Sequence, residues 1–143
     1  MLLGAMLAGQ SFANAPVAAV HALAYPLGGR CHIPHGLSNA LMLGPVLQFN
    51  MHAAAPLYAE LAEPAGADTT GTNSPEARAG AFCARMVELM NASGAPRRLR
   101  DADVAEEMLP TLAADAMLQT RLLGNNPVDV TEADALALYR QAF

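Results

Sequence analysis

Apolar side chains predominate over the first 50 residues, without the alternation of apolar and polar positions that marks a half-buried strand. Alanine, leucine and methionine, which are strong helix formers, dominate this stretch. A helix that is apolar on all sides belongs in the interior of a larger structure. The pattern therefore predicts three buried helices: residues 2–13, then Pro16 to the breakers Pro26 and Gly28–Gly29, then residues 36–50, opened by Pro34 and kinked at Gly44–Pro45.

Beyond residue 52, apolar positions recur with a helical period and polar residues separate them. Ser74 followed by Pro75 is a typical helix start, because the serine caps the first turn and the proline fits it. The expected elements are helices over residues 53–65, 75–93, 106–123 and 132–143, with a polar loop over residues 66–73 and Thr131 as the cap of the last helix.

We expect an all-α fold, a multi-helix bundle that forms one domain over residues 1–143. The clusters of β-branched and aromatic residues that mark strands are missing from the sequence, and so is the GxGxxG fingerprint of a nucleotide-binding turn. A chain of this length can bury a core without disulfides or a structural metal.

Composition excludes several classes of function. Thirteen acidic and eight basic residues give a formal net charge of -5, with no Trp, so nucleic-acid binding is not expected. All eight basic residues are arginine, which excludes Schiff-base and phosphate-loop lysine chemistry within this chain. Cys31 and Cys83 form no CxxC pair; we interpret them as small apolar residues of a cytoplasmic protein.

Charge is distributed unevenly, because Arg30 is the single formally charged side chain within residues 1–59. Export is one alternative, since Ala13-Asn14-Ala15 resembles a signal-peptide cleavage site. It is disfavoured, because no basic residue precedes Arg30 and Gln10, among other polar residues, interrupts the apolar run. We expect no membrane contact. We also expect a homo-oligomer, a dimer or larger, because uncovered apolar helices would expose more surface than a monomer tolerates.

Three of the four histidines, His21, His32 and His35, are close in the sequence. Imidazole suits borderline divalent metals, and the 14-residue spacing of His21 and His35 is consistent with two helices facing each other across a short turn. Spacing alone leaves open the alternative that both are core histidines whose ring nitrogens are hydrogen-bonded within the protein. Burying an imidazole without a polar partner would cost about 1–3 kcal/mol for each ring, which favours a metal ion shared by the two. No acidic residue precedes Glu60, so further ligands must come from elsewhere.

Three runs of sequence resemble the metal-binding signature of the iron-containing alcohol dehydrogenases: AGQSFANA at residues 8–15, VHALAYPLGG at residues 20–29 and PHGLSNA at residues 34–40. The tail from Asn125-Asn126-Pro127 to Tyr139 also resembles that family's C-terminus, so the resemblance covers essentially the whole chain. It implies a helical C-terminal domain that carries one divalent ion, iron or else zinc. The family's N-terminal NAD(P)-binding domain, and an aspartate and a histidine that complete the ligand set, would precede residue 1.

The resemblance implies that the chain is the C-terminal part of a metal-dependent alcohol dehydrogenase or aldehyde reductase, which passes hydride between a small alcohol or aldehyde and NAD or NADP. His21 and His35 match two metal ligands of the family. Tyr25 stands where many members carry a histidine that lines the nicotinamide site and relays protons, which implies a catalytic and cofactor-binding role; packing against the loop is the alternative. Phe12 matches an aromatic residue beside the substrate pocket.

The resemblance assigns no role to His32 and His52, which we expect at the surface or behind the ligands. We expect the isolated chain to be inactive, because the nucleotide-binding domain and two ligands would lie outside it. The alternative to a partial enzyme is a truncated, non-catalytic helical module that oligomerises through its apolar N-terminal half.

Overall fold

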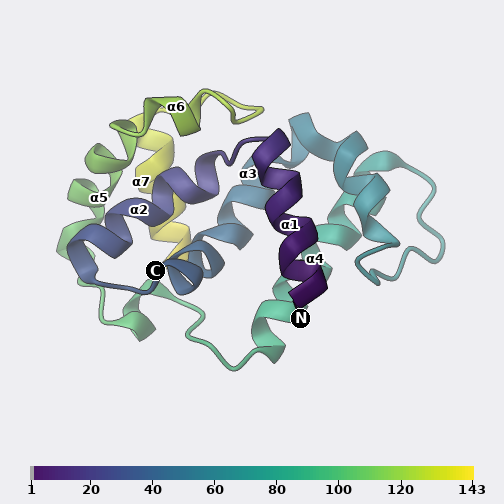
Figure 1. Ribbon diagram of the computed structural model, residues 1–143, viewed down its shortest axis with the longest axis horizontal. Helices are drawn as coiled ribbons and strands as arrows, with labels where there is room; N and C mark the ends of the chain where they lie inside the picture. The colour runs from purple at the N-terminus through teal and green to yellow at the C-terminus, as the bar shows by residue number, and fades with distance from the viewer. Residues whose placement is uncertain (1) are drawn as a thin grey trace.

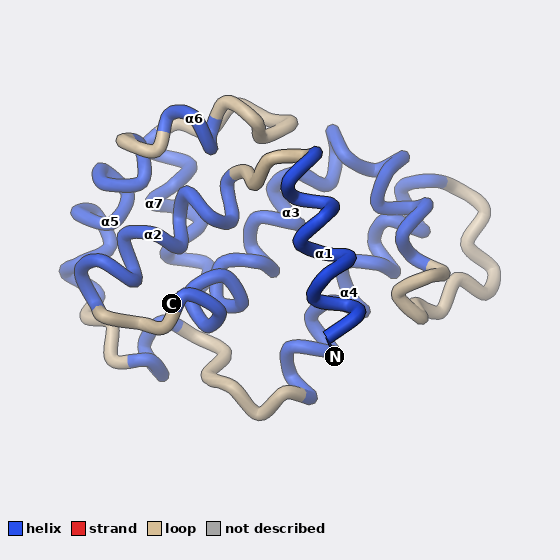
Figure 2. The backbone as a smooth tube through the Cα atoms, viewed as in Figure 1, coloured by secondary structure: helices blue, strands red, loops and turns tan. Residues whose placement is uncertain are grey.

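The computed structural model describes residues 2–143, and all regular structure in this part of the chain is helical (Figure 1; Figure 2). The longer helices are α1 (Leu2–Asn14), α2 (Ala19–Cys31), α3 (His35–Ala62), α4 (Pro75–Ala92), α5 (Leu109–Met117) and α7 (Glu132–Ala142). Shorter segments are the 3-10 helices η1 (Leu99–Ala102) and η2 (Glu106–Met108) and the short helix α6 (Thr120–Leu123). The predicted all-α fold is confirmed. Among residues 2–143, no helix combines the length and apolar character needed to cross a membrane.

Two helices start at the predicted capping residues. The Ser74 hydroxyl accepts a hydrogen bond of 3.1 Å from the backbone N–H of Ala77 at the start of α4. At the start of α7, the Thr131 hydroxyl accepts from the backbone N–H of Asp134, and the Asp134 carboxylate accepts from the backbone N–H of Thr131. Hydrogen bonds from the Thr131 hydroxyl and backbone lower the pKa of Asp134. These local signals therefore determine where both helices begin.

α2 does not end where the sequence pattern predicts. It was expected to stop at Pro26 and Gly28–Gly29, but it begins at Ala19 and continues to Cys31. A proline inside a helix removes a hydrogen bond and costs about 3 kcal/mol. Pro26 and the adjacent Leu27 are buried in the core, and their burial offsets that cost. The predicted end is wrong because packing outweighs the local preference.

α3 joins two segments that were expected to be separate helices over residues 36–50 and 53–65. Its 28 residues pass through Pro45 and Pro56. At 1.5 Å per residue the helix is about 42 Å long, which lets it contribute to two parts of the structure. Its first half packs on α2 and α7, and α4 packs along it. A second small cluster, Leu47, Ala62, Phe82 and Cys83, joins α3 to α4.

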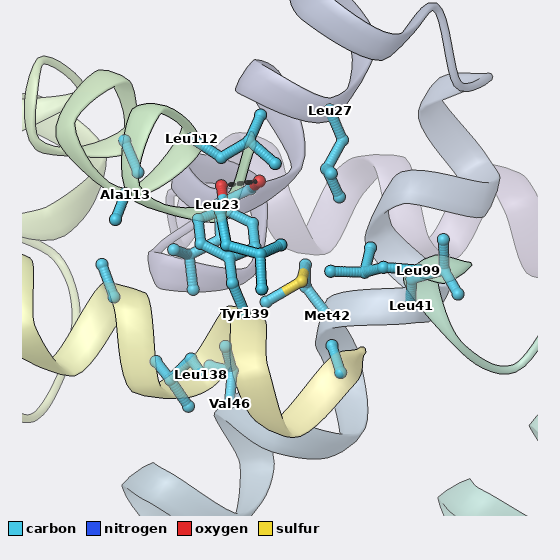
Figure 3. Packing of buried hydrophobic residues seen from close by; sticks show 14 of the residues in the cluster. Leu23, Leu27, Leu41, Met42, Val46, Leu99, Leu112, Ala113, Leu138 and Tyr139 are labelled. Carbon is cyan, nitrogen blue, oxygen red and sulfur yellow. Dashed lines mark hydrogen bonds between the residues drawn. The ribbon is translucent and has the colours of Figure 1, made fainter. Parts of the chain in front are cut away.

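The main core lies between α2, α3, α5 and α7 (Figure 3). Tyr139 crosses its centre: the ring is 0% exposed, and the hydroxyl donates a hydrogen bond of 2.6 Å to the backbone oxygen of Leu23. Burial raises the pKa of Tyr139 far above its usual value. This bond ties α7 to the middle of α2. Largest among the other fully buried side chains are Leu23, Leu27, Met42, Leu99, Leu109 and Leu112.

Both ends of α2 are also tied to other segments. Before its first turn, the backbone oxygen of Val17 accepts a hydrogen bond of 3.1 Å from the Asn125 amide. In its last turn, Arg30 forms an ion pair with Asp115 of α5, with a shortest distance of 2.6 Å. The position of α2 is therefore set at three points along its length.

α1 forms as predicted, but it is not buried. Figure 1 shows it crossing the molecule beside the rest of the bundle, and none of its residues is buried. Its exposed large side chains are Leu2, Leu3, Met6, Leu7 and Phe12, at 52–90% exposure. The predicted burial is wrong for this chain, because a helix that is apolar all round needs neighbours on every side, and residues 2–143 do not supply them.

We expect Tyr139→Phe to lower the free energy of unfolding by about 1–2 kcal/mol, because the change removes a buried hydrogen bond and keeps the ring. Denaturation followed by circular dichroism measures the effect. Tyr25→Phe is the matched control, since its side chain is exposed, and we expect it to change stability by less than about 0.5 kcal/mol. Equal stabilities of the two variants would show that the bond to Leu23 is not a stabilising contact.

Candidate functional site

Three aromatic side chains meet where α2 passes the start of α3. His21 and Tyr25 lie one turn apart on α2, and His35 is the first residue of α3. The ring centres of His21 and His35 are 5.2 Å apart, those of Tyr25 and His35 are 6.0 Å apart, and those of His21 and Tyr25 are 6.4 Å apart. The three residues singled out in the sequence thus form one cluster.

A tight connection between α2 and α3 brings His35 back toward His21. His32 ends α2 in the left-handed conformation, with φ 55°, and its N–H bonds to the backbone oxygen of Leu27. The next residue, Ile33, is buried and anchors the turn in the core. The buried Ser38 hydroxyl lies 3.3 Å from the backbone oxygen of Ile33 and 3.2 Å from that of Pro34. These contacts hold the first turn of α3 against the end of α2.

The two imidazoles differ in environment. His21 is half-buried and His35 is exposed. Burial lowers the pKa of His21, and the nearby positive charge that His35 carries when protonated lowers it further. His21 is therefore neutral at pH 7, which is the form that binds metals.

The spacing of the pair fits two ligands of one ion. Two imidazoles bound to a tetrahedral metal through bonds of about 2.0–2.1 Å have ring centres about 5 Å apart, and those of His21 and His35 are 5.2 Å apart. Within residues 2–143, no group of three His, Cys, Asp or Glu side chains is close enough to hold an ion. The described residues therefore fit part of a metal site, and further ligands must come from outside them.

Asn39 contacts His35 directly, and the sequence analysis missed it. Its amide nitrogen lies 3.0 Å from His35 Nε2 and 3.1 Å from the backbone oxygen of His35. The signal was present, because residues four apart share a helix face, which is the same argument that associates Tyr25 with His21.

Tyr25 also faces open space. It lines a shallow hollow of about 380 Å³, together with Gly29, Leu118 and Gln119, and the Arg30–Asp115 ion pair forms part of the wall. A narrower groove of about 300 Å³ between α3, α4 and residues 93–97 is lined by none of the three clustered rings. Of the three clustered rings, Tyr25 lines the hollow, and His21 and His35 are not among its lining residues.

The remaining candidates lie elsewhere. Phe12 is 59% exposed on α1, and among residues 2–143 no aromatic pair links it to the cluster. His32 and His52 are exposed, as expected. Cys31 and Cys83 are unbridged thiols, and burial raises the pKa of both. None of these residues adds a donor to the His21–His35 pair.

Comparison with known proteins identifies relatives of the whole chain. The family model for the C-terminal region of the Fe-containing alcohol dehydrogenases matches residues 1–143. Long-chain-alcohol dehydrogenase 1 of Geobacillus thermodenitrificans is 39% identical over 98% of the chain, and lactaldehyde reductase of Escherichia coli is 36% identical over 100%. These alignments cover 35% and 37% of the two relatives, so the chain spans about a third of their length.

Solved structures share the fold. A crystal structure of a 1,3-propanediol oxidoreductase superimposes with a TM-score of 0.89 at 37% identity, covering 96% of this chain and 35% of that one. An alcohol dehydrogenase from Oenococcus oeni also gives a TM-score of 0.89, at 33% identity, with 96% and 36% covered. The helical arrangement around the cluster is therefore one that solved alcohol dehydrogenases contain.

We expect His35→Gln to raise the pKa of His21 part of the way toward its usual value. The substitution removes the charge repulsion between the rings, but burial, the larger cause of the lowered pKa, remains. Titration of the His21 ring protons by NMR measures the change, with His52→Gln as the control at an exposed histidine. An unchanged His21 pKa in His35→Gln would contradict the observed proximity of the rings.

Proposed function

The chain belongs to the Fe-containing alcohol dehydrogenase family, and on this basis we propose that it is the helical, metal-holding domain of an NAD(P)-dependent alcohol dehydrogenase or aldehyde reductase. We propose that residues 1–143 form one such domain. The observation that carries the proposal is the pair of imidazoles, His21 and His35, 5.2 Å apart at the junction of α2 and α3.

His21 and His35 would hold one divalent ion, iron or zinc, through neutral ring nitrogens. The lowered pKa of His21 supports this role, because that ring needs no proton removed at pH 7. When bound, the ion would supply Lewis-acid polarisation of a carbonyl or alcohol oxygen, and NAD or NADP, held mainly by another domain, would supply or accept hydride. Two histidines do not complete a ligand set, so we propose an inactive chain in isolation.

Tyr25 would take part in the reaction at the hollow that it lines. Its ring lies next to both imidazoles, and Tyr25 also lines the 380 Å³ hollow together with Leu118 and Gln119. A phenol there can pack against a nicotinamide or substrate and donate a hydrogen bond to an oxygen. A phenol is in general a weaker proton relay at neutral pH than an imidazole.

The substrate is proposed only as a class, a small alcohol or aldehyde. Among the relatives, one is named for long-chain alcohols, one for lactaldehyde and one for 1,3-propanediol. The chain matches all three over nearly its whole length, so the shared domain does not distinguish them. Phe12 would border the substrate only if α1 were brought to the site by a covering segment.

The test is a chimera in which this chain replaces the corresponding C-terminal third of the lactaldehyde reductase relative. We expect the chimera to bind one equivalent of iron or zinc and to reduce aldehydes with NADH or NADPH. His21→Ala and His35→Ala should each lower kcat/KM by at least about 100-fold, because each removes a metal ligand. Metal content by mass spectrometry and initial rates are measured together.

His52→Ala is the matched control, an exposed histidine that should leave metal content and rate unchanged. In the same chimera we expect Tyr25→Phe to lower kcat about tenfold with metal content unchanged, because only the hydroxyl is lost. A folded chimera that binds no metal would refute the metal site. Full metal content with no activity on any aldehyde would refute the proposed reaction.

The exposure of α1 favours a second candidate, a non-catalytic module that oligomerises through this surface. Leu3 and Leu7 lie one turn apart on α1 and are 66% and 54% exposed. Such uncovered apolar surface is unfavourable in water and favours a homo-oligomer.

We therefore expect the isolated chain to sediment as a dimer or larger species, and Leu3→Glu/Leu7→Glu to shift it toward monomer. Leu57→Glu, at an exposed leucine on α3, is the control and should leave the assembly unchanged. A monomeric wild-type chain would exclude this candidate.

A further inference from the structure

Asn39 makes two contacts, and both are with His35. Its Nδ2 lies 3.1 Å from the backbone oxygen of His35 and 3.0 Å from Nε2 of the His35 ring. The Asn39 Oδ1 is buried and has no hydrogen-bond donor among the described residues. One amide group thus spans the backbone and the ring of the same histidine, one turn away on α3.

The backbone oxygen determines which way this amide faces. A carbonyl oxygen can only accept a hydrogen bond, so the Asn39 atom next to it must be the nitrogen, which donates. The opposite orientation would place the Asn39 oxygen against the oxygen of His35 and lose that bond. The NH2 group has a second hydrogen, and the remaining acceptor within reach is His35 Nε2.

This contact determines the tautomer of the ring. A neutral imidazole carries its proton on one nitrogen and a lone pair on the other. Because Nε2 faces a donor, it must present the lone pair, and the proton is on Nδ1. We infer that Asn39 is a positioning residue that holds His35 in the Nδ1–H tautomer, with the Nε2 lone pair directed at the Asn39 amide.

The consequence for metal binding rests on the proposed function. A metal binds the unprotonated nitrogen of a neutral imidazole, so Asn39 keeps His35 in the tautomer needed for ligation through Nε2. The amide hydrogen and a cation require the same lone pair. Cation binding therefore displaces the Asn39 amide from Nε2, while its bond to the backbone oxygen can persist.

NMR of the chain labelled with 15N in histidine and asparagine side chains tests the inference, above the pH range in which the rings titrate. In the metal-free wild type we expect His35 Nε2 to resonate as an unprotonated nitrogen and Nδ1 as a protonated one. Asn39→Leu, which keeps the size but removes the donor, should move both signals toward the average of two exchanging tautomers. A protonated Nε2 in the wild type would overturn the inference, and so would unchanged signals in Asn39→Leu.

Asn14→Leu is the matched control. Asn14 makes the same amide-to-backbone bond four residues back, 2.7 Å to the oxygen of Gln10, without a histidine ring. It should leave the His35 signals unchanged; a shift as large as that of Asn39→Leu would overturn the inference. If Asn39→Leu does not fold, the protonation state of His35 Nε2 in the wild type still tests the inference.

Addition of zinc to the labelled chimera, in which the relative's part supplies the further ligands, separates this inference from the proposed metal site. We expect zinc to shift His35 Nε2 and the side-chain amide of Asn39 but not that of Asn14. If zinc shifts His35 Nε2 but leaves the Asn39 amide unmoved, the displacement is refuted. If zinc moves neither, yet Nε2 is unprotonated in the free chain, the metal site fails and the role of Asn39 in fixing the tautomer stands.

Discussion

The buried face of α2 determines where the side chains of His21 and Tyr25 lie. Ala19, Leu23 and Leu27 are four residues apart and 0% exposed, and the Tyr139 hydroxyl bonds to the backbone of Leu23. At 3.6 residues per turn, His21 and Tyr25 then lie on the opposite side of the helix. Packing on one side of α2 thus fixes the direction of the two rings on the other side. A core change that rotated the helix would move both rings away from His35.

Local signals in the sequence were sufficient for two of the helix starts and for part of the candidate site. The caps at Ser74 and Thr131 act through hydrogen bonds to residues three positions away, so they could be predicted without knowledge of the fold. The pairing of His21 with Tyr25 follows from helical spacing in the same way. Asn39 could have been placed beside His35 by that rule as well.

Features that depend on distant contacts could not be predicted from the sequence. Pro26 is tolerated in α2 because α3 and α5 pack against this helix in the core. Likewise, α3 continues through Pro45 because α2, α4 and α7 pack along it. The opposite error occurred at α1, where composition indicated burial but residues 2–143 provide no covering elements. In each case the outcome depends on neighbours that local patterns do not encode.

The His21–His35 pair also poses a problem of charge. Both rings would be neutral as ligands, so an ion of charge +2 would keep its full charge between them. Residues 1–59 contain no carboxylate, and among residues 2–143 no acidic side chain lies close enough to complete a site with the two histidines. In a segment with so little charge, burying an uncompensated cation is costly. An anionic ligand from another segment or another molecule would therefore be needed both to complete the coordination of the proposed ion and to neutralise it.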